Sequence, residues 1–139
     1  MIDKRNSQTI TFKLGEMIFE YDEWKNAYNI EHHGISFKQA ARVFFDYDRI
    51  ELYDEENGKT EERYDTIGDL SAGYVNVPAT KETVIGNINS FSGEINDIIF
   101  VVYTERIKTD KMEEKNSVIR LISARFATNF ERGLYYGKY

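Results

Sequence analysis

Apolar and polar residues alternate near the amino terminus of this chain. Residues 10–14 alternate strictly, and a second apolar-rich stretch over residues 17–21 follows Gly15. Because successive side chains of a strand point to opposite faces, both stretches are typical of half-buried strands. The glycine between them is suited to a turn. The sequence therefore predicts a hairpin as its first element.

A helical pattern replaces the alternation after Asp22. Asp22 can cap a helix that runs from about residue 23 to residue 33, and Gly34 stands where a left-handed residue would end it. One face of this helix is expected to carry Trp24, Ala27, Tyr28 and Glu31. Ser36 and Gln39 form a capping box for a second helix. Its apolar residues recur at the helical spacing: Phe37, Ala40, Ala41 and Phe44.

Alternation returns beyond Asp46. Ile50 and Leu52 fall on one side of a predicted strand, and Asn57 with Gly58 marks a tight turn. Further strands are predicted over residues 63–68, 98–106 and 116–125, and a last helix begins at a capping box of Thr128 and Glu131. The order of elements predicts an α+β fold, an antiparallel sheet with two N-terminal helices and one C-terminal helix packed on it.

Residues 70–97 interrupt this order. They are rich in Gly, Ser, Asn and Thr and contain the only proline, Pro78. We expect an irregular loop here, with a short strand over residues 83–88 as the best candidate for local structure.

Composition indicates one soluble, cytoplasmic domain spanning residues 1–139. The chain is 41% hydrophobic and has no cysteine, which excludes disulfides, thiolate metal sites and a cysteine nucleophile. The longest apolar run, residues 98–102, is far shorter than the ~20 residues of a membrane helix. No membrane association is expected.

The net charge of -6 at first argues against a nucleic-acid partner, because phosphate contacts need lysine and arginine. The charge is unevenly distributed, however: residues 99–139 hold eight basic and five acidic side chains. This basic last third predicts either a separate basic face for RNA or an ordinary solvated surface.

Metal and nucleotide chemistry find little support in the motifs. The only histidines, His32 and His33, are consecutive, and consecutive helical residues point in directions about 100° apart. The chain contains no phosphate-binding glycine motif. We therefore expect neither a metal nor another cofactor.

Acid–base groups and cations gather instead in the last third. Strand alternation places Tyr103 and Glu105 on one face and Arg106 on the other. Arg120 lies between Val118 and Ile122 on its own face, a position that requires a carboxylate partner or a phosphate ligand. The sequence leaves both alternatives open.

Several short blocks, in order, resemble the BrnT toxin family. The opening blocks are Phe19-Glu20-Tyr21-Asp22, Lys25, Asn29, His33-Gly34-Ile35-Ser36-Phe37, Ala40 and Val43-Phe44. The later blocks are Glu62-Arg63-Tyr64, Ile67-Gly68, Val101-Val102-Tyr103-Thr104-Glu105-Arg106, Ile119-Arg120, Ile122-Ser123-Ala124-Arg125, Ala127 and Glu131-Arg132. Against this pattern, residues 1–16 are an N-terminal extension and residues 70–97 an insertion.

The resemblance implies a RelE-like ribonuclease fold, RNA cleavage that inhibits translation, and neutralisation by a BrnA-like antitoxin with a ribbon-helix-helix domain. It also implies a hetero-oligomer of toxin and antitoxin, and operator DNA is expected to be bound only through the antitoxin. The alternative is a non-catalytic member that only binds its partner protein.

RNA can be cleaved without metal when a base takes the 2′-hydroxyl proton, cations stabilise the phosphorane and an acid protonates the leaving oxygen. The candidate catalytic residues for this chemistry are His33, Tyr103, Glu105, Arg106 and Arg120. The candidate phosphate-binding residues are Lys25, Arg106, Arg120 and Arg125. The leading hypothesis is that Arg106 and Arg120 bind the scissile phosphate while His33 or Glu105 moves the proton.

Overall fold

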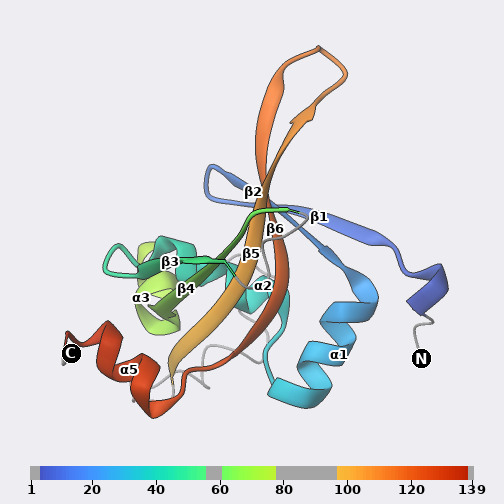
Figure 1. Cartoon of the computed structure of the whole chain (residues 1–139). Helices are drawn as coiled ribbons and strands as arrows, with labels where there is room; N and C mark the ends of the chain where they lie inside the picture. Colours follow the sequence, from blue (N-terminus) through green and yellow to red (C-terminus); the bar gives the residue numbers. More distant parts are fainter. Residues whose placement is uncertain (1–3, 56–60, 78–96, 138–139) are drawn as a thin grey trace.

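A six-stranded sheet forms the centre of the fold (Figure 1). The computed structural model describes residues 4–55, 61–77 and 97–137. In spatial order the strands are β1 (Thr9–Leu14), β2 (Met17–Asp22), β6 (Lys115–Phe126), β5 (Ile98–Thr109), β4 (Arg63–Asp69) and β3 (Ile50–Asp54). Among these described strands, only the β2–β6 pair is parallel. The predicted α+β class and the β1–β2 hairpin are confirmed.

The helices include one that the sequence pattern did not predict. They are α1 (Glu23–His33), α2 (Phe37–Ala40), α3 (Leu70–Asn76) and α5 (Asn129–Tyr135), with short 3-10 turns η1 (Lys4–Asn6) and η2 (Ala41–Phe45). The predicted second helix consists of α2 followed directly by η2, so it changes from α-helix to the narrower 3-10 helix after one turn. In the described part of the chain, none of the helices has the length and apolar character needed to cross a membrane.

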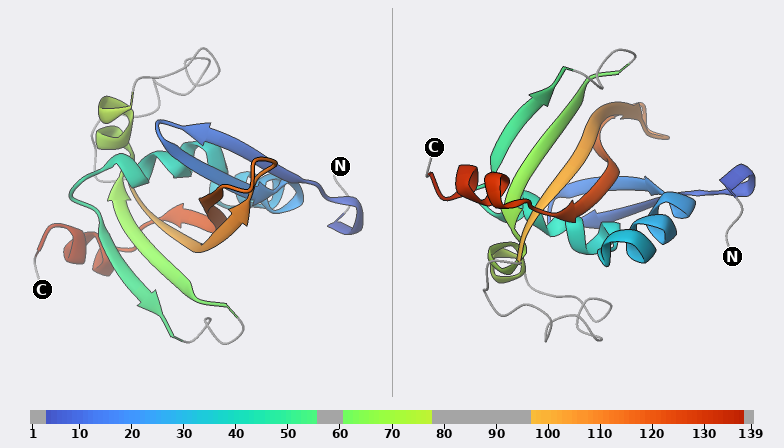
Figure 2. Two further views of the ribbon diagram at one scale, coloured as in Figure 1. Left: turned by 90° about the horizontal axis from the view of Figure 1, so that it is seen from above. Right: turned by 60° about the horizontal axis from the view of Figure 1, so that its bottom comes forward.

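The sheet has one apolar and one charged face. On the apolar face the α2–η2 segment buries Phe37, Val43 and Phe44 against β2, β5 and β6, and Phe19 packs on Phe44 with ring centroids 5.5 Å apart. On the opposite face α5 covers only one end, where Ala127 packs with Ile67 and Ile98. Helix α5 lies beside the start of β5 (Figure 2). The rest of this second face, which we call the charged face, carries Arg106, Arg120 and Arg125 of the candidate site.

Helix α1 is attached to the sheet by amide groups. Asp22 caps it and Gly34 ends it in the left-handed conformation, as predicted. The buried side is formed by Asn29, whose side chain accepts from Ala124 N–H and donates to Ala124 O and Ile35 O at 2.7–3.0 Å. The face predicted to carry Trp24, Ala27, Tyr28 and Glu31 does not attach the helix to the sheet, because Ala27, Tyr28 and Glu31 are exposed.

Helix α3 corrects the prediction of an irregular loop from residue 70. Asp69 accepts a hydrogen bond from Ser71 N–H at 2.8 Å and thereby caps the helix. A Cβ at Gly73 would lie 2.0 Å from the carbonyl oxygen of Arg42, so only glycine allows α3 to approach η2 this closely. The predicted turn at residues 57–58 and the candidate strand over residues 83–88 lie outside the described residues.

Candidate functional site

The charged face is built by the alternation of four strands. In β5 the side chains of Thr104, Arg106 and Lys108 point to it, and register places Arg120 of β6 opposite Thr104 and Glu20 of β2 beside Arg120. This register confirms the prediction that the Arg106 side chain points to the opposite face of the sheet from those of Tyr103 and Glu105. The three cations Arg106, Lys108 and Arg120 therefore share this face, and two of them, Lys108 and Arg120, contact the carboxylate of Glu20.

Glu20 is the buried centre of this group. It is 1% exposed, and Arg120 Nη1 and Lys108 Nζ each lie 2.5 Å from one of its carboxylate oxygens. Burial raises the pKa of Glu20, but the bonds and charges of Lys108 and Arg120 outweigh it, so the pKa lies below its usual value. Of the two alternatives left open for Arg120, the structure shows the carboxylate partner.

The other two predicted arginines are also paired. Arg106 donates to Glu61 at 3.1 Å and is partly exposed. Arg125 makes two hydrogen bonds to Glu131 of α5, at 2.7 and 2.9 Å, and its guanidinium lies 4.3 Å from the Phe100 ring centroid. Basic and acidic side chains are thus intermixed. The prediction of a separate basic face is wrong, because carboxylates from distant segments fold onto the same surface.

Asp65 is a candidate that sequence reasoning missed. It lies on the charged face in β4, between Leu52 and Val102 in the register. Burial, with the negative charge and hydrogen bond of Asp54, raises the pKa of Asp65 to about 6. The signal was present in the sequence, since Asp65 is two residues from the buried Ile67 and shares its face. A carboxyl that titrates near neutrality suits proton transfer.

Tyr103 belongs to the core. It is 5% exposed and packs edge-on against Phe44 at 4.9 Å between centroids. Its hydroxyl donates to Glu51 at 2.8 Å. Burial and this carboxylate raise the pKa of Tyr103 far above its usual value. The group is therefore a protonated core residue on the face opposite Arg106.

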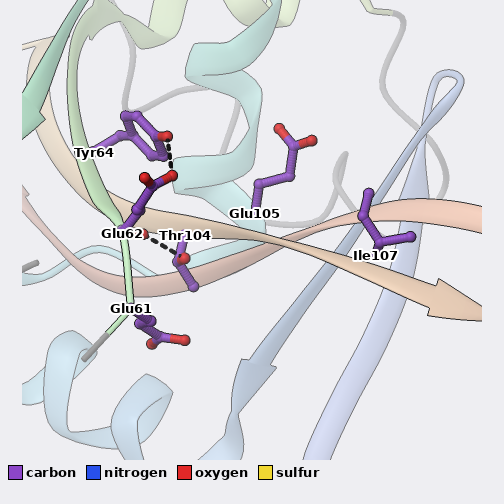
Figure 3. A pocket seen from close by; sticks show the side chains of 6 residues that line it. All are labelled: Glu61, Glu62, Tyr64, Thr104, Glu105 and Ile107. Atoms are coloured by element: carbon purple, nitrogen blue, oxygen red, sulfur yellow. Dashed lines mark hydrogen bonds between the residues drawn. The ribbon is translucent and has the colours of Figure 1, made fainter.

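Glu105 is exposed and lines two hollows. One, of about 330 Å³, lies beside Glu61, Glu62 and Tyr64, where β5 extends past the start of β4 (Figure 3). The other, of about 260 Å³, lies beside Glu16 and Ile119. Carboxylates dominate the first hollow, which makes it an unfavourable position for an RNA phosphate.

His33 and Lys25 lie on α1, outside the charged face. His33 is exposed in the last turn, and the Lys25 ammonium lies 5.6 Å from the Tyr28 ring centroid. The structure therefore brings Arg106 and Arg120 together. It does not gather His33, Tyr103 and Glu105 around them.

Metal ligands do not cluster in what the structure describes. Residues 4–55, 61–77 and 97–137 contain no group of three or more histidine, aspartate or glutamate side chains placed to hold a metal ion.

Comparison with known proteins identifies the family. A family model described as the ribonuclease toxin BrnT of type II toxin-antitoxin systems matches residues 21–90. The matched range holds α1, α2, α3, β3 and β4. It continues into residues 70–97, and their status as an insertion stays a prediction. A comparison with curated proteins gave no match. Because the family model covers half of its length, this chain belongs to the BrnT family of ribonuclease toxins.

Proposed function

We propose that this protein is an endoribonuclease toxin that cleaves RNA without a metal ion, inhibits translation and is neutralised by a BrnA-like ribbon-helix-helix antitoxin. The observation that carries the proposal is membership in the ribonuclease toxin family. In this account the fold is RelE-like, and operator DNA is bound through the antitoxin.

The scissile phosphate lies on the charged face in this proposal. Arg106, Lys108 and Arg120 contribute three positive charges there, against the carboxylates of Glu20 and Glu61. A phosphate can replace Glu61 at Arg106, whose side chain is 40% exposed, while Arg120 stays fixed by Glu20. The guanidinium groups would stabilise the extra charge of the phosphorane.

Asp65 is the proton acceptor that fits this position best. Asp65 and Arg120 lie on the same face with β5 between their strands, which are roughly 10 Å apart. Because Glu20 holds the Arg120 side chain on the other side of β6, the bound RNA would have to span this gap. The raised pKa of Asp65 favours proton uptake near neutrality. Glu105 points to the other face, and His33, at the end of α1, stays a candidate for protonating the leaving oxygen.

The test is induction of the chain alone in cells, followed by growth and RNA integrity. Wild type is expected to stop growth and degrade RNA. Arg106→Ala should relieve both effects, because it removes an exposed cation without leaving a buried charge unpaired. Lys13→Ala, which removes an exposed cation from β1, is the matched control and should remain toxic. Full toxicity of a folded Arg106→Ala would contradict the proposed site.

A non-catalytic, partner-binding member is the second candidate function. It is favoured by the carboxylate partners that Arg106, Arg120 and Arg125 already have. Co-expression with the product of a neighbouring reading frame, read by the mass of the complex, tests partner binding. Absence of growth arrest and of RNA loss in the uncomplexed chain would favour this second function.

A further inference from the structure

The outward side of α1 carries a row of three rings: Trp24, Tyr28 and His32. Residues spaced by four lie on one side of a helix. The Trp24 and Tyr28 centroids are 5.5 Å apart with planes inclined by 28°, and those of Tyr28 and His32 are 4.0 Å apart with planes inclined by 34°. Tyr28 is 41% exposed and His32 is also exposed. Tyr28 directly precedes Asn29, about 100° around the helix, so the ring row lies to one side of the Asn29 side that attaches the helix.

Lysines lie over the ring row. Lys4 Nζ is 5.1 Å from the Trp24 centroid, and Lys25 Nζ is 5.6 Å from that of Tyr28. Among the described residues neither lysine has a carboxylate partner, in contrast to Arg106, Arg120 and Arg125. Glu23 and Glu31 are the acidic residues of the same helix. The lysine ammonium groups are thus available for a ligand that combines flat apolar rings with negative charge.

The ring row begins beside the charged face. Burial raises the pKa of Asp22, but hydrogen bonds from Ser7 and the helix backbone, with the charge of Arg120, bring it below its usual value. Asp22, two residues before Trp24, therefore lies within the electrostatic reach of Arg120. At 1.5 Å per residue the row extends about 12 Å from Trp24 to His32, enough for roughly two or three nucleotides of a single strand.

We propose that the ring row of α1 binds the bases of single-stranded RNA next to the cleavage site, with Lys4 and Lys25 contacting its phosphates. This inference rests on the proposed ribonuclease function. The face of His32 turned away from Tyr28 ends the row and can receive an unstacked base. Every base has a flat face that can stack on a ring, so this kind of binding tolerates many RNA sequences. The lysines add electrostatic attraction to the phosphates of the RNA backbone.

Binding is tested with a fluorescently labelled 2′-O-methyl RNA oligonucleotide of ten nucleotides, which cannot be cleaved by 2′-hydroxyl attack. Fluorescence anisotropy gives Kd, and quenching of Trp24, the only tryptophan of the chain, reports binding at the row itself. Tyr28→Ala and His32→Ala should each raise Kd about tenfold. Alanine suits exposed helical positions, and circular dichroism verifies folding.

Two controls distinguish base stacking on the row from RNA binding elsewhere and from attraction to the RNA backbone alone. Tyr47→Ala removes a tyrosine that is 75% exposed outside α1 and should leave Kd unchanged. An abasic strand of the same length should bind weakly and equally to wild type and both row variants.

Each outcome has one meaning. Wild-type Kd values in both folded row variants, or failure of wild type to bind the oligonucleotide, would overturn the inference even if unmodified RNA is cleaved. If the row variants no longer form a complex with the partner protein but bind RNA as wild type does, the inference would also be overturned, because the row would then be a protein interface. Row-dependent binding without cleavage of unmodified RNA would support the row and refute the proposed function.

Discussion

At the scale of single residues, long-range pairing decides which charged groups are available. Arg120 and Glu20 are 100 positions apart, yet parallel pairing of β2 with β6 brings them to 2.5 Å. The sequence predicted that Arg120 needs a partner and could not identify it, since no local pattern connects β2 to β6. Asp65 shows the opposite case, a carboxyl that folding places beside another carboxyl.

Removing the charge of Asp65 should stabilise the protein at high pH. Because the folded-state pKa of about 6 exceeds the unfolded value of 3.8, the wild type loses stability as pH rises through this interval. Asp65→Asn avoids that loss. Its free energy of unfolding should exceed that of wild type by about 1 kcal/mol at pH 8, a value discounted for partial exposure, and match it below pH 4.

Urea unfolding at several pH values measures this difference. Asp48→Asn removes the same charge at an exposed position and serves as the control. A stability gain for Asp65→Asn that does not depend on pH would show that its carboxyl is not perturbed. In the proposed mechanism the same variant should also cleave RNA more slowly, so stability and activity should change in opposite directions.

At the scale of elements, capping signals were reliable, whereas the sequence did not predict which side of α1 is buried. The bounds of α1, both capping boxes and the first hairpin agree with the sequence prediction. The buried side of α1 could not be predicted, because the amide of Asn29 rather than apolar side chains attaches it to β6, at Ala124, beyond the residues of β6 that pair with β2. Helix α3 was missed because Gly73 lowers helix propensity. The structural role of this glycine is to allow close contact with η2, which the sequence does not reveal.

Asn29 should be the residue that fixes α1. Asn29→Ala leaves the Ala124 N–H and carbonyl and the Ile35 carbonyl without their side-chain partner in a buried place. We expect a loss of about 2 kcal/mol in the free energy of unfolding. The neighbouring Ile30→Ala, at a position 46% exposed, should change it by less than about 0.5 kcal/mol. Equal effects of the two substitutions on the free energy of unfolding in urea would contradict the attachment of α1 through the Asn29 amide.

At the scale of the whole molecule, the distribution of charge limits how RNA is bound. The net charge is -6, and on the charged face Arg106, Lys108, Arg120 and Arg125 are already paired with carboxylates. Counting residues along the chain predicted a basic region, but folding mixes it with acidic residues from β2, β4 and α5. In the proposed RNA complex we therefore expect stacking on α1 to contribute a larger share of the affinity than electrostatics.

The salt dependence of RNA binding should accordingly be shallow. Each neutralised phosphate of a single strand adds about 0.7 to the slope of log Kd against log salt concentration. With two or three phosphates neutralised, the magnitude of the slope should not exceed about 2. Anisotropy titrations with the 2′-O-methyl oligonucleotide between 50 and about 300 mM salt measure it. A magnitude of about 4 or more would indicate the separate basic face that the structure does not show.

The most direct test of ribonuclease function is cleavage of end-labelled RNA by the purified chain in the presence of EDTA. Attack by the 2′-hydroxyl predicts internal cleavage with 2′,3′-cyclic phosphate ends, unaffected by EDTA and reduced at least tenfold in Arg106→Ala. Intact RNA after incubation with folded wild type, or cleavage that EDTA abolishes, would contradict a metal-independent endoribonuclease.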